Sequence, residues 1–276
     1  MKKAFPGYSV LMSVYFKERP EYLRESMMSI FCQSHAPEDF VLICDGPLTV
    51  ELDAVIDDMQ KLFGKVLNVH RLEKNGGLGS ALNTGLGLCK NDIVIRMDSD
   101  DISEEDRCRV QTAYLAKHPD IDILSGTIEE FFGSKDNIFG KRELPSGHKA
   151  ICAFSKKRNP FNHPAVAFRK KAVLSAGSYD ETFHLFEDYY LWIRMLMKDM
   201  RGHNLNRTLV YMRTPPDMYK RRGGFQYARD MLRFHWWVKR SGWSSMADFV
   251  TGAVPHAVVC VLPNSLRKFV YEVLHK

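Results

Sequence analysis

Three carboxylates follow one another closely in the stretch "RMDSDD", residues 96–101. Asp98, Asp100 and Asp101 lie within four positions, directly after the apolar run "NDIVI", which is typical of a buried strand. Like charges this close raise one another's pKa, so the fully ionised cluster is unfavourable by itself. The sequence therefore predicts either a cation at this place or a cluster that faces water.

Two other acids also stand where a side chain could take part in chemistry. Asp45 closes the segment "FVLICDGP", and Asp188 stands beside Glu187 at the start of a segment with helical spacing. Each also has an ordinary structural explanation. Asp45 suits a turn before Gly46-Pro47, and an acid pair at the start of a helix is favoured by the helix dipole.

Strand-like and helix-like segments alternate in the first hundred residues. The strand-like segments are 8–15, 40–47, 65–73 and 92–98, and the helix-like ones are 21–34, 48–63 and 75–89, the last opened by a glycine-rich loop. This alternation predicts an α/β fold with a Rossmann-like, mostly parallel sheet flanked by helices. In such a sheet, ligands bind beyond the carboxyl ends of the strands. Asp45, Asp98 and Asp100 therefore belong to the edge where a ligand is expected.

The second part of the chain is less regular. We expect a helix over 104–119, a strand over 121–131, a loop over 133–148, a strand with a short helix within 159–181, and a helix over 186–200. Thr49 is expected to cap the helix of 48–63, and Asp101 is expected to cap the helix that follows it.

Length and composition limit the class of protein. A chain of 276 residues, 45% of them apolar, is long enough for one large domain with a substantial core. The six cysteines are scattered without a CxxC pair, which favours reduced thiols over disulfides or zinc. We expect no signal peptide. The apolar run "FVTGAVPHAVVCVL" has 14 residues with Pro255 inside it, too few to span a membrane.

Charge is distributed unevenly along the chain. Residues 194–276 contain 15 Lys and Arg against 5 Asp and Glu, so they carry +10, whereas residues 1–193 carry −4. A basic and aromatic end suits an anionic lipid surface or a phosphorylated ligand. The sequence shows no nucleic-acid-binding motif, so we expect no nucleic-acid partner.

Seven segments, taken in order, resemble the family 2 glycosyltransferases with the GT-A fold, of the kind that assembles bacterial surface polysaccharides. They are "SVLMSVY", "VLICDGP", "NGGLGSALNTG", "RMDSDD", "NHPAVAFRK", "FEDYYLWIRM" and "YKRRGG". The resemblance covers roughly residues 8–225. It implies a GT-A domain over 1–225, with a nucleotide-binding part to about 102 and an acceptor-binding part from about 103. A basic helical extension over 226–276 would follow.

The resemblance implies that Asp98 and Asp100 form a DxD motif that binds a divalent metal and the sugar nucleotide. Carboxylate oxygens suit Mn²⁺ or Mg²⁺, and the cation would lie between these acids and the diphosphate of the donor. It would also stabilise the departing nucleoside diphosphate. This interpretation supplies the cation that repulsion between the acids calls for.

The resemblance also assigns residues to the donor nucleotide. Asp45 would contact the base, although the family often has two adjacent acids where this chain has Cys44-Asp45. Arg221 and Arg222 would close over the diphosphate, where an arginine can make two parallel hydrogen bonds. The expected donor contacts are Val14, Tyr15, Glu18, Asp45, Asn75, Gly77, Asn83, Asp98, Ser99, Arg221 and Arg222.

For the reaction, the resemblance implies that Asp188 is the catalytic base. Direct displacement at the anomeric carbon needs a group that takes the proton of the acceptor hydroxyl, opposite the leaving diphosphate, and it inverts the anomeric configuration. His163, Glu187 and Trp192 would lie near the acceptor or the donor sugar. His163 has the alternative of an ordinary hydrogen-bonding histidine.

Taken together, the resemblance implies an inverting, metal-dependent hexosyltransferase of O-antigen or capsule assembly. The donor would be a UDP-sugar, with galactose or glucose favoured, and the acceptor a glycan on polyprenyl diphosphate. We expect the protein in the cytoplasm, peripheral on the inner face of the cytoplasmic membrane, with its basic tail on anionic lipid. For the tail, the alternative is a helical lid packed on the core. The competing functions are a sugar-phosphate nucleotidyltransferase and a catalytically silent nucleotide-sugar or glycan-binding protein.

Overall fold

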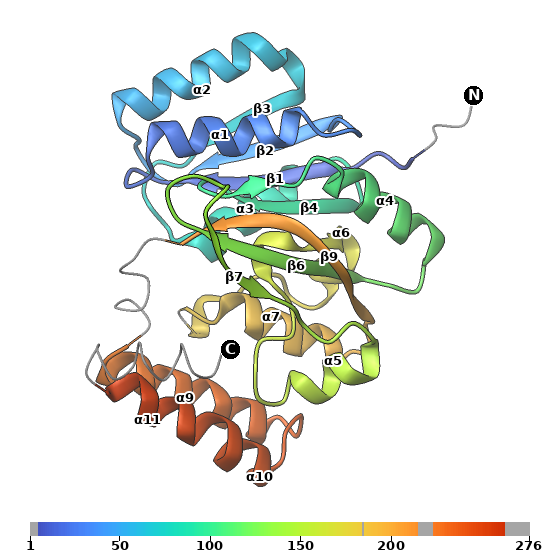
Figure 1. Ribbon diagram of the computed structural model, residues 1–276, viewed down its shortest axis with the longest axis vertical. Helices are drawn as coiled ribbons and strands as arrows, with labels where there is room; N and C mark the ends of the chain where they lie inside the picture. Colours follow the sequence, from blue (N-terminus) through green and yellow to red (C-terminus); the bar gives the residue numbers. More distant parts are fainter. Residues whose placement is uncertain (1–4, 184, 215–222, 263–276) are drawn as a thin grey trace.

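The computed structural model describes residues 5–183, 185–214 and 223–262. Within these residues a sheet of nine strands forms the centre of the fold, in the order β3-β2-β1-β4-β8-β6-β9-β5, with β7 added on β6 (Figure 1). The strands are β1 (Ser9–Val14), β2 (Asp39–Cys44), β3 (Leu67–Arg71), β4 (Ile93–Asp98), β5 (Ile102–Ser103), β6 (Ile123–Phe131), β7 (Ile138–Arg142), β8 (Ala167–Arg169) and β9 (Gly202–Arg213).

Helices cover both faces of this sheet. The helices of the described residues are α1 (Pro20–Phe31), α2 (Val50–Phe63), α3 (Leu78–Leu88), α4 (Arg107–Lys117), α5 (His148–Phe154), α6 (Lys170–Ser175), α7 (Glu187–Leu196), α9 (Phe225–Arg240), α10 (Met246–Asp248) and α11 (Val254–Val261). Four short 3₁₀ or π segments among the described residues complete the set: η1 (Gly64–Val66), η2 (His163–Ala165), η3 (Glu181–Phe183) and η4 (Phe249–Ala253).

The first four strands form the parallel sheet that the sequence predicted. β1 pairs in parallel with β2 and β4, and β2 pairs in parallel with β3. Successive side chains of a strand point to opposite faces. Val10 and Met12 therefore pack in the core with α1 and α2, whereas Leu11 packs on the opposite face with α3. The predicted cap is confirmed, because the hydroxyl of Thr49 accepts a hydrogen bond from the amide of Leu52 at 3.3 Å.

The other half of the sheet is mixed. β8 runs antiparallel to β4 and β6, and β5 runs antiparallel to β9, whereas β6 and β9 are parallel to each other. The expected loop over 133–148 is wrong in part, because it contains β7, which pairs antiparallel with β6. β7 lies at the edge of the sheet with Ile138 and Phe139 exposed, so its residues lack the alternation of a half-buried strand.

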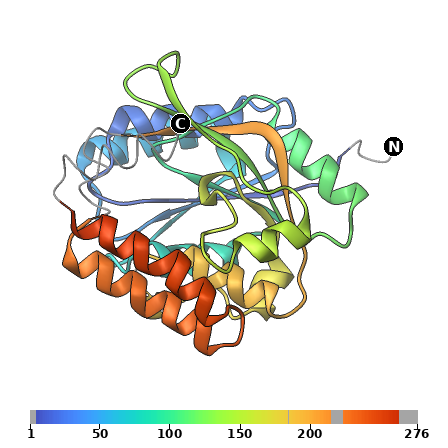
Figure 2. The same cartoon turned by 60° about the horizontal axis from the view of Figure 1, so that its bottom comes forward.

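The C-terminal helices pack on the rest of the molecule through an apolar cluster. Phe183, Phe186 and Ile193 meet Met231 and Phe234 of α9, and these side chains are buried. α9 and α11 lie side by side below α7 (Figures 1 and 2). The described part of the expected extension, up to residue 262, is helical, and its inner face is part of the core. Among the described residues, none of the helices has the length and apolar character needed to cross a membrane.

Candidate active site

The carboxyl ends of β1, β2 and β4 meet at one edge of the sheet. Parallel register places Val14 beside Cys44 and Ser13 beside Asp98. Asp45 and residues 98–101, which we call the DSDD turn, therefore both extend beyond this edge. The sequence predicted this meeting from the alternation of strands and helices.

The two expected nucleotide contacts at the end of β1 differ in access. Val14 is 1% exposed, and its carbonyl accepts the amide of Asp45 at 2.8 Å. Tyr15 is 39% exposed and stands beside the exposed ring of Phe16. Tyr15 is therefore the residue of this pair whose side chain is open to a ligand.

Asp98 already has a cationic partner within the fold. Both terminal nitrogens of Arg96 donate to the two carboxylate oxygens of Asp98. Arg96 is 1% exposed and lies in β4, two positions before Asp98. The sequence reasoning missed this residue. Its signal was a single cation at a buried position of an otherwise apolar strand.

Asp100 is the acid whose charge is poorly compensated. Burial raises the pKa of Asp100 to about 7, and the charges of Asp98 and Glu18 add to the effect. A raised pKa means that the ionised carboxylate lacks positive surroundings. A divalent cation fits this place, because it would stabilise Asp100 in its ionised form.

A metal here would be held by few protein ligands. Among the described residues, no group of three or more His, Cys, Asp or Glu side chains converges on one point. A cation at Asp98 and Asp100 would complete its shell with phosphate oxygens and water, as Mg²⁺ commonly does. Such a site would bind metal and nucleotide best together.

The prediction that Asp101 caps a helix is wrong. Residues 102–103 form β5, and α4 begins only at Arg107. Asp101 is 2% exposed, and its Oδ1 accepts the backbone amide of Arg213 at 2.8 Å. Burial, with Asp100 and Asp98 nearby, raises the pKa of Asp101 well above its usual range. The third acid of the turn is therefore a buried anchor to β9.

Glu18 and Ser99 are joined across the site. The Ser99 hydroxyl donates to Oε2 of Glu18 at 2.6 Å, and the backbone amide of Arg19 donates to Oε1 at 2.8 Å. The loop after β1 is thereby tied to the DSDD turn. The two predicted donor contacts are therefore hydrogen-bonded to each other at this edge of the sheet.

Asp45 organises the glycine-rich loop. Its Oδ1 accepts the amide of Gly76 at 2.7 Å, and its Oδ2 accepts the amide of Gly77 at 3.1 Å. The side chain of Asn75 donates to the carbonyl of Asp45 at 3.1 Å. Gly77 precedes α3 with a φ of 86°, a left-handed conformation that suits glycine. The predicted residues do come together, but Asp45 fills the amide positions that a phosphate could use.

Asn83 has a clear structural task. Its side-chain nitrogen donates to the carbonyl of Tyr179 at 2.7 Å, and its oxygen accepts the amide of Tyr179 at 2.9 Å. Asn83 thus fixes the chain around residue 179 against α3. Both ends of its amide are used within the protein.

His163 and Trp192 have partners inside the fold. Nε2 of His163 lies 3.0 Å from the hydroxyl of Tyr179, and burial lowers the pKa of His163 well below its usual range, so the imidazole is neutral. Trp192 is fully buried against Phe161 and Phe168. In the described part of the chain its indole nitrogen has no hydrogen-bond partner. The structure places the Trp192 ring in the core.

Asp188 lies in the first turn of α7. Its Oδ2 accepts a hydrogen bond from the side chain of Asn159 at 2.7 Å. Burial raises the pKa of Asp188, although the Asn159 hydrogen bond opposes this effect. A carboxylate with a raised pKa accepts a proton more readily, which suits a general base. Glu187 precedes it at the start of the helix and is half-buried.

The two arginines expected to close over the diphosphate, Arg221 and Arg222, lie outside the described residues.

Comparison by sequence connects this geometry to known proteins. A model of the family described as glycosyl transferase family 2 matches residues 9–177. An Escherichia coli protein named UDP-Gal:alpha-D-GlcNAc-diphosphoundecaprenol beta-1,3-galactosyltransferase is 39% identical, covering 97% of this chain and 96% of that protein. The amylovoran biosynthesis glycosyltransferase AmsE of Erwinia amylovora is 34% identical, covering 96% and 98%.

Comparison by structure confirms the GT-A fold that the sequence predicted. The mannosyltransferase PcManGT of Pyrobaculum calidifontis, solved with GDP-Man and Mn²⁺, has a TM-score of 0.65 at 15% identity, covering 99% of this chain and 84% of that chain. S. aureus TarS 1–349 with UDP-GlcNAc has a TM-score of 0.60 at 19% identity, covering 83% and 65%. The matched part is 40% of a longer TarS chain.

Proposed function

Because the chain belongs to the family 2 glycosyltransferases, we propose that it transfers galactose, with inversion, from UDP-galactose to a lipid-linked glycan in bacterial surface-polysaccharide synthesis. The observation that carries this proposal is the 39% identity, over nearly the whole of both chains, to an enzyme whose name states that donor and acceptor. The edge formed by Asp45, Asp98 and Asp100 supports it, because it offers a place for a nucleotide and a cation.

In the proposed reaction, Asp188 takes the proton from the acceptor hydroxyl. The hydroxyl oxygen then forms a bond to the anomeric carbon as the bond from that carbon to the diphosphate breaks, and UDP leaves with the bonding electrons. Asn159 orients the carboxylate of Asp188 through its 2.7 Å hydrogen bond. A bound Mn²⁺ or Mg²⁺ would supply charge for the departing diphosphate. Asp98 and Asp100 would hold it.

The experiment is a UDP-release assay with several UDP-sugars and a GlcNAc-diphosphate-lipid acceptor, in Mn²⁺ or in EDTA. Asp188→Asn should lower turnover by about 10²- to 10⁴-fold while UDP affinity stays unchanged. Asp57→Asn, the same change at an exposed position of α2, is the control and should have no effect. Turnover by Asp188→Asn at the normal rate would refute the assignment of the base. UDP binding by the wild type without release from any donor would favour a silent binding protein.

We also propose that the outer face of α9 contacts an anionic membrane. Helical spacing places one set of exposed side chains along this face. The set is Phe225, Arg229, Arg233, Trp236 and Arg240. Arginine and tryptophan together suit the headgroup region of an anionic bilayer. The inner face of α9 packs in an apolar core cluster to which α11 also contributes. Removal of α11 would therefore expose that core.

Substitution is therefore a cleaner test of this contact than truncation. Flotation with phosphatidylglycerol vesicles should recover the wild type but not the triple variant Arg229→Glu, Arg233→Glu, Arg240→Glu. The matched control reverses the charge of three exposed lysines on other helices by substituting glutamate for Lys61, Lys65 and Lys117. It should float like the wild type. If the α9 triple variant floats as well as the wild type, α9 does not form the membrane contact.

A further inference from the structure

The DSDD turn is held from one side by a polar stripe on α1. The hydroxyl of Ser26 donates to the carbonyl of Asp98 at 2.6 Å, and the hydroxyl of Ser29 accepts the amide of Ser103 at 2.9 Å. Tyr22 and Glu25 continue the stripe toward the start of the helix, at the spacing of one helical face. α1 therefore holds the start of the turn and β5, the short strand that follows it.

Arg213, the last residue of β9, holds the middle of the turn. Its Nε donates to the carbonyl of Asp100 at 2.9 Å, and its backbone amide donates to Asp101 Oδ1 at 2.8 Å. These two contacts join positions 112 or 113 residues apart in the sequence. One residue thus fixes two successive residues of the turn.

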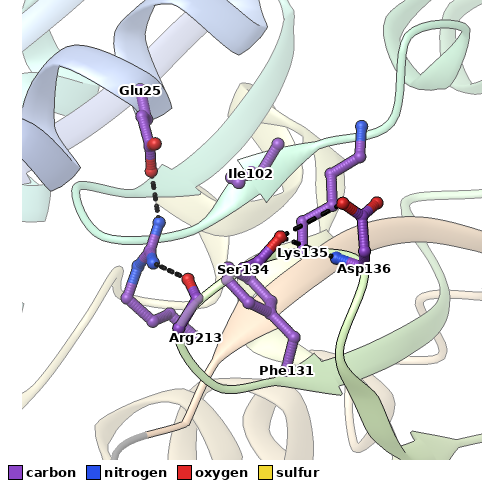
Figure 3. Close-up of a pocket in the computed structure, with 8 residues that line it drawn as sticks. Glu25, Ile102, Phe131, Ser134, Lys135, Asp136 and Arg213 are labelled. Atoms are coloured by element: carbon purple, nitrogen blue, oxygen red, sulfur yellow. Dashed lines mark hydrogen bonds and ion pairs between the residues drawn. The ribbon is translucent and has the colours of Figure 1, made fainter.

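The guanidinium of Arg213 is itself immobilised. It forms an ion pair with Glu25 and donates through Nη1 to the carbonyl of Gly133 at 3.2 Å (Figure 3). Its centre lies 3.9 Å from the ring centroid of Tyr22 and 4.7 Å from that of Phe131. Arg213 is 8% exposed. All three nitrogens of the guanidinium therefore have hydrogen-bond partners. A lysine has a single nitrogen and could not reproduce this set of contacts.

The ion pair lies beside a cleft of about 450 Å³. Glu25 and Arg213 line one part of it, and residues 133–136 between β6 and β7 line another (Figure 3). Glu25 is 56% exposed here, so the pair can be altered from the cleft side without opening the core. The contact to the carbonyl of Asp100 uses Nε, a different nitrogen from those that contact Glu25 and Gly133.

We propose that Arg213 is a positioning residue of the donor site, which fixes the backbone of the DSDD turn so that the carboxylates of Asp98 and Asp100 are presented together. Through its contacts with Glu25 and Tyr22 of α1, Arg213 connects β9 of the second half of the sheet to the nucleotide-binding half. This inference rests on the proposed role of Asp98 and Asp100 in binding the donor. Arg213 touches neither substrate nor cation in it.

The first test measures the apoprotein by amide hydrogen exchange. Arg213→Lys keeps the charge near Glu25 but loses the contact to the carbonyl of Asp100. We expect exchange at the amides of Ser103 and residue 213 to rise about tenfold or more, as for loss of one hydrogen bond from a charged donor. Glu25→Gln leaves the contact to Asp100 in place and should change exchange less. Native exchange in Arg213→Lys would overturn the proposal.

The second test separates positioning from general stability. In Mn²⁺, Arg213→Lys should weaken UDP binding and raise KM for the donor about tenfold, with KM for the acceptor unchanged. A purely structural role would lower the melting temperature and the active fraction but leave both KM values as they are, and that result would refute positioning. If Arg213→Lys does not fold, Tyr22→Leu removes one of the stacked rings instead, and it should raise the same amide exchange. Wild type that fails to bind UDP would refute the proposed function. The exchange result would still decide whether Arg213 fixes the DSDD turn.

Discussion

Arg96 donates through both terminal nitrogens to the carboxylate of Asp98, two residues further along β4. The first acid of the DSDD turn is therefore neutralised within the protein itself. In the described part of the chain, no lysine or arginine side chain forms such a pair with Asp100, and its pKa is raised to about 7. The repulsion that the sequence suggested thus falls mainly on Asp100, which makes it the acid that most needs an added cation.

The Arg96–Asp98 pair should behave as a unit in unfolding experiments. Arg96→Met leaves the half-buried Asp98 without its partner and should lower the free energy of unfolding by about 1–3 kcal/mol, less than for a fully buried pair because Asp98 keeps contact with water. Asp98→Asn should also be costly, because it leaves Arg96 buried beside a neutral group. The double variant should cost clearly less than the sum of the two. Additive losses in urea denaturation would contradict the pairing.

Asp100 should make the apoprotein less stable as pH rises. Its pKa is about 7 in the folded protein and 3.8 ordinarily, so the folded state binds the proton more tightly. This contribution is fully present below about pH 4 and is lost as pH rises through 7. Urea denaturation in EDTA should therefore show that wild type loses stability relative to Asp100→Asn between pH 5 and pH 8. An equal difference at both pH values would contradict the burial of this carboxylate.

The affinity for a divalent metal should also depend on the protonation of Asp100. A cation that binds ionised Asp100 displaces its proton below pH 7, so the affinity for Mn²⁺ in the presence of UDP should increase as pH rises toward 8. Isothermal titration at pH 6 and pH 8 checks this, and the increase should be absent in Asp100→Asn.

Asn159 should tune the base through its hydrogen bond to Asp188. This hydrogen bond lowers the pKa of Asp188 against the effect of burial. Asn159→Ala removes it, so the pKa of Asp188 should rise and the acid limb of the kcat profile should move to higher pH. The exposed Asn137 offers a control in Asn137→Ala. An acid limb that stays in place, or moves to lower pH, would contradict a role for Asp188 as the titrating base.

Gly46 should be more sensitive to substitution than another glycine with a positive φ. At Gly46, φ is +85° and an added Cβ would lie 2.6 Å from the amide nitrogen of Asn75. At Gly64, φ is +52° with nothing within 4 Å of an added Cβ. Gly64→Ala should cost about 1–3 kcal/mol for the backbone alone, and Gly46→Ala should cost more, because its methyl group would also meet the backbone of Asn75. Equal losses in denaturation would show that the loop yields to the methyl group.

The sequence could predict the parallel half of the sheet because each strand and helix there carries its own periodic signal. The same alternation placed Asp45 and the DSDD turn at one edge, since the carboxyl ends of parallel strands coincide. β7 was missed because an exposed edge strand carries no clear alternation. The role of Asp188 came from the resemblance to the family. Its helix was predicted from residue 186, and α7 begins at Glu187.

Long-range partners could not be predicted from local pattern. Asp101 looks like a helix cap in sequence, yet its partner is the amide of Arg213, 112 residues later. Arg213 itself is one cation among the many in the basic part of the chain. Its role depends on where β9 ends relative to the DSDD turn, which only the folded sheet determines. Arg96 is different, because a lone arginine in a buried strand already indicates a buried anion nearby.

The most direct test of the proposed function is the stereochemistry of the product. Wild type incubated with UDP-galactose, Mn²⁺ and a GlcNAc-diphosphate-lipid acceptor should form a disaccharide whose new bond, by the proton coupling at the anomeric carbon, is a β-galactoside. The donor is the α-anomer, so this result is inversion, and Asp188→Asn should lower the rate of its formation by about 10²- to 10⁴-fold. An α-linked product, or no transfer from any UDP-hexose, would contradict the account.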